Sequence, residues 1–109
     1  MHVEKDPLDR VFMALADNTR RQMVDRLAKQ EMTISELTEG FDMSLAAASK
    51  HVKVLENAKL VKRRVEGRVH TISLAPEQLA PALDWISIYR NFWQKRMDQL
   101  SKIIKNSED

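Results

Sequence analysis

Apolar side chains recur every three or four positions over most of the chain, which is the spacing of one face of an α-helix. This pattern predicts helices over residues 7–16, 18–29, 34–40, 45–58 and 76–105. Residues 61–65 and 69–74 instead form two β-branched runs joined through Glu66-Gly67, a composition typical of a hairpin with a two-residue turn. The hairpin over 61–74 is the only β structure expected, so the chain is predicted to be mainly α within an α+β class.

Capping residues support these helix boundaries. Thr33 and Glu36 fit a capping box, in which each side chain accepts a hydrogen bond from the other residue's free backbone N–H. Gly40 adopts a positive φ without strain and is expected to close the helix over 34–40. The residues expected at the other helix starts are Asp6 followed by Pro7, Asp17 or Asn18, and Ser44.

Length and composition restrict the class of protein. A chain of 109 residues is the size of a single domain, and 43% hydrophobic with 31% charged residues is typical of a soluble globular protein. No cysteine is present, which excludes disulfides and zinc–thiolate sites. Residues 1–7 lack the apolar segment of a signal peptide and no run is long enough to span a membrane, so a cytoplasmic location is expected.

The positive charge of this nearly neutral chain is concentrated in one segment. Residues 44–70 carry 7 basic and 2 acidic side chains, whereas residues 1–43 carry 6 basic and 9 acidic ones. A local basic surface on a protein of net charge +2 indicates a defined site for a polyanion. The alternative is that these lysines and arginines only solvate an exposed helix and hairpin.

The helix over 45–58 has two distinct faces. The buried stripe is expected to contain Ala48, Val52 or His51, Leu55 and Ala58. The side chains left facing outward are Leu45, Ala46, Ser49, Lys50 and Lys53. The charged face of this helix is therefore predicted to be the exposed one.

Three segments carry a resemblance to a known family. They are FMALADNTRRQMVDRL (12–27), TISELTEGFDMSLAAASKHVKVLENAKLVKRRVEGR (33–68) and LDWISIYRNFWQKRMDQL (83–100). In these segments the chain resembles the ArsR family of bacterial transcriptional repressors. The resemblance implies a winged helix-turn-helix fold in one domain over 1–109, with the helix over 45–58 as the recognition helix and the hairpin as the wing. It also implies a homodimer that binds double-stranded DNA.

The expected DNA contacts come from the recognition helix and the wing. A helix in the major groove reads base edges with its N-terminal half, while lysine and arginine bind phosphates. Alanine methyl groups suit thymine methyls, which favours A·T-rich sites read partly through DNA shape. For His51, packing against the helix over 34–40 and contact with a phosphate are both open. The candidate DNA-binding residues are Ser44, Ala46, Ala47, Ser49, Lys50, His51, Lys53, Arg63, Arg64 and Arg68.

The last helix carries more apolar surface than a small core needs. One stripe contains Leu79, Leu83, Ile86, Tyr89, Trp93, Met97, Leu100 and Ile104, and a second contains Trp85, Ile88, Phe92 and Ile103. In the family that the chain resembles, the first and last helices join the two subunits, although both stripes could instead pack within one subunit. The candidate dimer-interface residues are Leu8, Phe12, Trp85, Ile88, Phe92 and Trp93. A two-fold dimer predicts an inverted-repeat operator.

The metal-sensing residues of the family are missing. Thr33 and Ser35 occupy the region of its cysteine motif, and no histidine follows His70. We therefore expect no metal site and no cofactor, and regulation by an unknown effector, a partner protein or protein concentration. Lys59 stands where relatives have the glycine that ends the recognition helix. No phosphate-binding glycine loop or catalytic cluster is present, so an enzyme is not expected. The alternative function is a winged-helix module that binds protein or RNA.

Overall fold

The computed structural model describes residues 6–75, 77 and 79–107 of the chain. Five helices and three strands lie in this part, in an order that defines a winged helix-turn-helix domain. The elements are α1 (Pro7–Leu15), α2 (Asn18–Leu27), β1 (Met32–Thr33), α3 (Ile34–Leu37), α4 (Leu45–Asn57), β2 (Val61–Glu66), β3 (Val69–Leu74) and α5 (Leu79–Ser107).

Side-chain caps begin four of the helices. The Asp6 carboxylate accepts from the backbone N–H of Leu8 at 2.9 Å, and the Asp17 carboxylate accepts from that of Arg20 at 3.0 Å. Thr33 forms the complete capping box with Glu36, and α3 ends at Leu37, three residues before the predicted end at 40. Gly40 has a φ of +87° and lies in the turn that follows α3, not at its last residue. These caps satisfy backbone donors that a helix start leaves free.

The core lies where α1, α2, α3, α4 and the sheet meet. Met23 of α2, Leu37 of α3 and Leu55 of α4 are completely buried, and Ile72 of β3 closes the core from the sheet. On α4, the buried positions are Ala48, Val52 and Leu55, with Ala58 directly after the helix. Burial of this stripe determines which side of α4 remains outside, and that side carries the lysines.

The sheet has three strands, so the prediction of a hairpin alone was wrong. β1 pairs antiparallel with β3 through Met32 opposite Ile72, which gives the strand order β1-β3-β2. In the hairpin, Glu66 pairs with Val69, so the turn residues are Gly67 and Arg68 and not Glu66 and Gly67. Gly67 has a φ of +61°, a conformation that glycine adopts readily and that two-residue hairpin turns require.

The end of α4 is a Schellman motif built without glycine. Lys59 has a φ of +60°, its N–H donates to the Glu56 carbonyl, and the N–H of Leu60 donates to the Leu55 carbonyl at 3.0 Å. Leu55 and Leu60 are both buried and supply the hydrophobic contact that accompanies this motif. Lys59 therefore has the left-handed conformation for which a glycine would be the ordinary choice.

Replacing Lys59 with glycine is expected to stabilise the domain. The left-handed conformation costs an L-residue roughly 1–2 kcal/mol, and the greater entropy of unfolded glycine offsets part of this, so the net gain is about 0.5–1 kcal/mol. Thermal denaturation followed by circular dichroism would measure it. The matched control is Lys53→Gly in the middle of α4, which should instead destabilise by about 1 kcal/mol. Equal destabilisation by both changes would contradict the strain assigned to Lys59.

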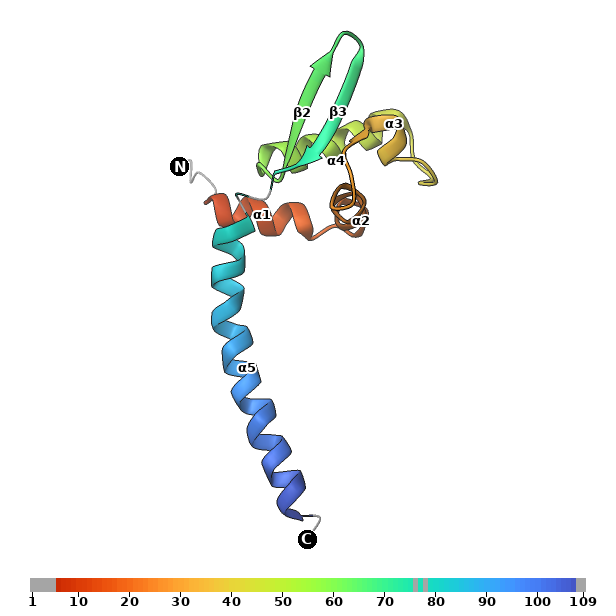
Figure 1. Cartoon of the computed structure of the whole chain (residues 1–109). Coiled ribbons are helices and arrows are strands. Elements are labelled where there is room, and N and C mark those ends of the chain that lie inside the picture. Colours follow the sequence, from red (N-terminus) through yellow and green to blue (C-terminus); the bar gives the residue numbers. More distant parts are fainter. Residues whose placement is uncertain (1–5, 76, 78, 108–109) are drawn as a thin grey trace.

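Helix α5 extends away from the rest of the domain, on the side opposite the wing (Figure 1). It contains 29 residues without interruption, and the described chain measures 69 Å along its longest axis. Only its first turns reach the core, through Leu79 and Ala82. Pro81 lies in the first turn, where its missing N–H would have no helical partner, so it causes no break. The predicted start at residue 76 lies outside the described residues.

Candidate nucleic-acid interface

The outer face of the recognition helix α4 is exposed to solvent. The Ser44 hydroxyl accepts from the backbone N–H of Ala47 at 3.1 Å and begins the helix. Ala46, Lys50 and Lys53 are exposed on the side opposite the buried stripe. Among the described residues, neither lysine has an ion-pair partner. This face therefore has the small and cationic side chains that a major-groove helix needs.

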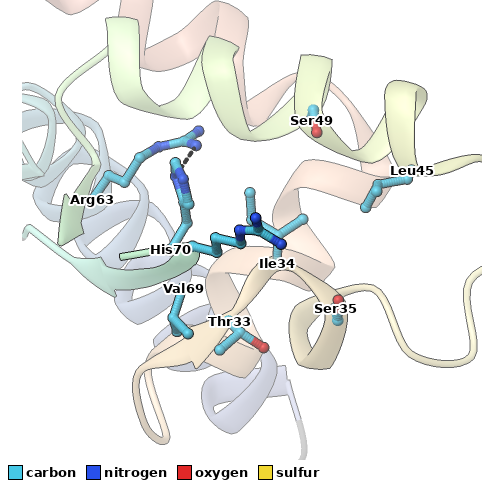
Figure 2. Close-up of a pocket in the computed structure, with 9 residues that line it drawn as sticks. Thr33, Ile34, Ser35, Leu45, Ser49, Arg63, Val69 and His70 are labelled. Atoms are coloured by element: carbon cyan, nitrogen blue, oxygen red, sulfur yellow. Dashed lines mark hydrogen bonds between the residues drawn. The ribbon is translucent and has the colours of Figure 1, made fainter. Parts of the chain in front are cut away.

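A cleft separates the start of α4 from the wing. It has a volume of about 450 Å³ and is open to solvent between α3, α4 and β3 (Figure 2). Its lining residues are Thr33, Ile34, Ser35, Leu45, Ser49, Arg63, Arg68, Val69 and His70. The predicted contacts Ser49, Arg63 and Arg68 therefore come together around one cleft, although they belong to three different elements.

His51 faces α2. The Arg20 guanidinium lies 3.3 Å from the His51 Nδ1 and also donates to the carbonyls of Ala14 and Met13. Because a guanidinium only donates, Nδ1 accepts this hydrogen bond. The Asp17 carboxylate is 3.8 Å from the same nitrogen. The polar contacts of His51 are thus with the start of α2 and not with the helix over 34–40, and Nδ1 is not available to a phosphate.

The carboxylate of Asp17 is stabilised in its charged form. The backbone N–H of Arg20 donates to it, and this hydrogen bond is the main reason that the pKa of Asp17 is lowered; the positive charge of Arg20 acts in the same direction. The ionised Asp17 carboxylate therefore caps α2, and Arg20 and His51 connect the start of this helix to the inner side of α4.

Two of the three wing arginines are engaged by carboxylates. Arg63 faces the core side of the sheet, where it binds Glu56 of α4 at 2.6 Å and lies 3.0 Å from His70 Nδ1. Arg64 faces the other side and binds Glu31 at 3.1 Å and Glu66 at 2.5 Å. The prediction that both lie along DNA assumed free guanidinium groups, and the structure places each against a carboxylate.

The Arg64 side chain stabilises the carboxylate of Glu31 in its charged form. The pKa of Glu31 is lowered, chiefly because the Arg64 side chain donates to it and secondly because the arginine is positively charged. Both groups are exposed, so the pair contributes little to folding stability. The pair neutralises a wing cation that the sequence pattern counted as available.

The unpaired cations of the basic segment therefore form a smaller set than its composition indicates. Lys62 contacts Glu77 at 3.4 Å, and Arg63 and Arg64 are paired as described. Within residues 6–75, 77 and 79–107, the basic side chains of residues 44–70 that lack an ion pair are Lys50, Lys53, Lys59 and Arg68. Sequence reasoning missed Glu31 and Glu77 because they lie outside the basic segment, and it could not pair Glu56 with Arg63 because they belong to different elements. The alternation of a strand could have placed residues 63 and 64 on opposite faces.

The candidate dimer residues divide into two groups. Leu8 and Phe12 of α1 are half-buried against the core, and the Phe12 ring contacts Trp85 of α5 edge to face at 5.5 Å. Farther along α5 the side chains stand free of the domain: Ile88 is 67% and Trp93 61% exposed. Phe92 is also exposed, with the Arg96 guanidinium 5.0 Å above its ring. Both stripes of α5 thus remain largely uncovered, and the alternative that they pack within one subunit does not hold beyond Trp85.

Neither a metal cluster nor a membrane span is found in the described residues. No group of three or more His, Cys, Asp or Glu side chains is arranged there to hold a metal ion. None of the described helices combines the length and the apolar character that crossing a bilayer requires.

Comparison with known proteins gives consistent matches. A family model described as a helix-turn-helix domain matches residues 15–64. The transcriptional regulator Rv2034 of Mycobacterium tuberculosis is 35% identical over 93% of this chain and 92% of its own length. The transcriptional repressor SdpR of Bacillus subtilis is 29% identical over 77% of this chain and 93% of its own.

Solved structures match over a similar extent. The ArsR family transcriptional regulator RHA00566 has a TM-score of 0.75 and 34% identity, covering 82% of this chain and 98% of that one. The homodimeric winged helix-turn-helix DNA-binding domain Mb0332 of Mycobacterium bovis has a TM-score of 0.62 and 25% identity, covering 88% and 95%.

The fold, together with the exposed basic face of α4 beside the wing, defines a winged helix-turn-helix DNA-binding protein. The matches with Rv2034 and RHA00566 extend over most of this chain and identify its family. The chain belongs to the ArsR family of helix-turn-helix transcriptional regulators, and it is not an enzyme.

Proposed function

We propose that this protein is a cytoplasmic transcriptional repressor that binds an inverted-repeat operator in duplex DNA as a homodimer. The observation that carries the proposal is the outer face of α4, where Lys50 and Lys53 are exposed and have no ion-pair partner among the described residues. The same holds for Arg68 of the wing turn. Two relatives support it, since SdpR is a transcriptional repressor and Mb0332 is a homodimeric DNA-binding domain.

The apolar surface of α5 is the proposed subunit interface. Trp93 and Ile88 stand free of the domain, and Trp85 continues this surface to Phe12 of α1. An exposed apolar surface of this extent marks an interaction site in a water-soluble protein. A second copy related by a two-fold axis would cover the same residues on both chains, including Leu8 and Phe92. The two recognition helices would then enter the major groove about 34 Å apart, one turn of DNA.

Base recognition in this arrangement depends on small side chains. Ala46 and Ala47 offer methyl groups to thymine, and Ser44 and Ser49 offer hydroxyls to bases or phosphates. With few long polar side chains on the helix, much of the specificity would come from the shape and flexibility of the DNA. The proposed operator is therefore rich in A·T pairs.

Regulation by the metal sites found in other family members is not part of the proposal. Thr33, in the region of the cysteine motif, is occupied by the capping box with Glu36, and its hydroxyl donates to that carboxylate at 2.9 Å. Release from the operator would instead follow an unidentified effector, a partner protein or a fall in protein concentration.

The salt dependence of operator binding is expected to be moderate. The proposed phosphate contacts in each subunit are three cations without an ion pair among the described residues, Lys50, Lys53 and Arg68. They give six contacts in a dimer and a slope of log K against log salt of about −5. If Arg63 and Arg64 also contacted phosphates, the slope would be about −9. Fluorescence anisotropy over a series of salt concentrations measures this slope.

The salt slopes of single variants test each assigned phosphate contact separately. Arg68→Ala should reduce the magnitude of the slope by about 2, since each of two subunits loses one contact. Arg64→Ala should leave the slope within about 0.5 of the wild type, because its guanidinium is already paired with Glu31 and Glu66. A larger change with Arg64→Ala would show that the ion pairs open on binding and would contradict the assigned contact surface.

The proposed function itself is tested by selecting duplexes from a random pool with the purified protein. Enrichment of an inverted repeat, bound by a dimer in sedimentation measurements, is the expected result. Failure to bind any duplex at low ionic strength would overturn the proposal. Binding of a single-stranded RNA or of another protein in its place would support the alternative of a winged-helix interaction module.

A further inference from the structure

The cleft between α3, α4 and the wing has an unusual balance of polar groups. None of its nine lining residues is acidic, whereas Arg63, Arg68 and His70 carry nitrogen donors. Its apolar wall is formed by Ile34, Leu45 and Val69, of which Leu45 is 65% exposed. The cleft therefore combines a hydrophobic wall with nitrogen donors, of which only Arg63 has a carboxylate partner, Glu56, among the described residues.

His70 has one ring nitrogen to offer. Arg63 Nη1 lies 3.0 Å from His70 Nδ1, and a guanidinium can only donate, so Nδ1 is the acceptor (Figure 2). In the neutral ring the proton is then on Nε2. This N–H has no acceptor among the described residues. The hydrogen bond from Arg63, which is itself fixed by Glu56, thus orients His70 as a donor at the cleft.

Other donors around the cleft are also unused. In the described part of the chain, the guanidinium of Arg68 and the hydroxyls of Ser35 and Ser49 have no hydrogen-bond partner. Thr33 differs, because its hydroxyl donates to Glu36 and accepts from the Glu36 N–H. Several donors with one cation and no acceptor suit an oxygen-rich anion.

We propose that this cleft binds a phosphate group, and that its occupant is one phosphodiester of the DNA backbone. Arg68, His70 Nε2 and the Ser49 hydroxyl donate to the phosphate oxygens. Ile34, Leu45 and Val69 contact the carbon atoms of the adjoining deoxyribose. This inference rests on the proposed function and adds to it His70, a residue that the sequence pattern did not assign to DNA.

The position of the cleft favours the backbone as the source of the phosphate. It lies between the groove-reading helix and the wing turn, and a strand that passes from the major groove under α4 to the minor groove at the wing must cross that interval. A contact of this kind fixes the register of the protein on DNA without reading sequence. A free phosphate monoester has the same chemistry and is distinguished by experiment.

The test measures the affinity of protein variants for a series of operators. In each operator one phosphate is replaced by a neutral methylphosphonate, and the replaced position moves along each strand from one operator to the next. At one position in each half-site the wild type should lose about tenfold in affinity. His70→Asn keeps an oxygen acceptor for Arg63 near the place of Nδ1 and removes the Nε2 donor. His70→Asn and Arg68→Gln should each lose roughly three- to tenfold on unmodified DNA. At the identified position each variant should lose further affinity by clearly less than the tenfold that the wild type loses.

Lys53→Ala is the matched control, because its exposed side chain does not line the cleft. Its loss should add to that of the methylphosphonate at the identified position. Thermal melts check that each variant folds. If wild type binds the operator but the losses of His70→Asn and Arg68→Gln are additive at every position, the cleft assignment is wrong and the proposed function stands. If wild type binds no duplex, the proposed function fails first.

A second arm titrates the DNA-free protein with glycerol 3-phosphate, followed by NMR. Affinity weaker than about 1 mM, with unchanged operator binding in its presence, supports the backbone as occupant. Submillimolar binding that is lost in Arg68→Gln and that releases the operator would overturn it, and would identify the cleft as a site for a free phosphate monoester.

Discussion

Replacing Trp93 with glutamate is expected to separate the dimer into folded monomers and to reduce operator affinity by at least a hundredfold. Trp93 lies in the part of α5 that stands free of the domain and is 61% exposed in the single chain. In the proposed dimer it is covered by apolar side chains of the second copy, where an unpaired carboxylate would cost several kcal/mol. A monomer would bind one half-site and lose the gain of about 10²–10⁴ from simultaneous binding.

Sedimentation equilibrium and anisotropy with operator DNA measure the two effects. Asn91→Glu is the matched control, because it makes the same change of charge on the same helix. Two residues rotate an α-helix by about 200°, so Asn91 lies on the side opposite Trp93. Asn91→Glu should remain dimeric and bind the operator as wild type does. A stable dimer of Trp93→Glu with unchanged affinity would place the subunit interface elsewhere.

The second large effect is expected from Lys50→Ala combined with Lys53→Ala. Both lysines are exposed on the outer face of α4 and have no ion pair among the described residues. A dimer would lose four phosphate contacts, so the salt slope should decrease by about 3.6 and the affinity by at least about a hundredfold at physiological salt. Alanine favours the helix, so the melting temperature should not fall.

Lys62→Ala tests whether this result reflects position or merely positive charge. Lys62 is also an exposed lysine of the basic segment, but it is paired with Glu77 at 3.4 Å. Its removal should change operator affinity by less than about twofold. If Lys62→Ala weakened binding as much per residue as the α4 variant does, net charge and not the recognition helix would govern affinity.

Much of the fold could be predicted from local patterns. Helix starts were identified because residues such as Thr33 and Ser44 act within one turn, through hydrogen bonds that the sequence spacing specifies. The buried side of α4 was identified because three- and four-residue spacing places Ala48, Val52 and Leu55 in one stripe. β1 was missed because two residues are too few to show the alternation of a strand.

The site was predicted less completely. The basic segment drew attention to α4 and the wing, but the sequence could not show that Arg64 meets Glu31, 33 positions away in the chain. It also gave no sign that the His70 ring joins Arg63 to the edge of a cleft built from three elements. Lys59 is a further case, since a lysine gives no sign of a positive φ.

The sequence by itself determined the order of the helices and the hairpin, the caps at the helix starts, the buried face of α4 and the family resemblance. These depend on interactions within a few residues or on periodicity along one helix. The tertiary structure alone decided which cations of residues 44–70 are unpaired, what His51 and His70 contact, and how far α5 stands clear of the core. These depend on distances between side chains remote in the chain, and only the packing of the helices against the sheet sets such distances.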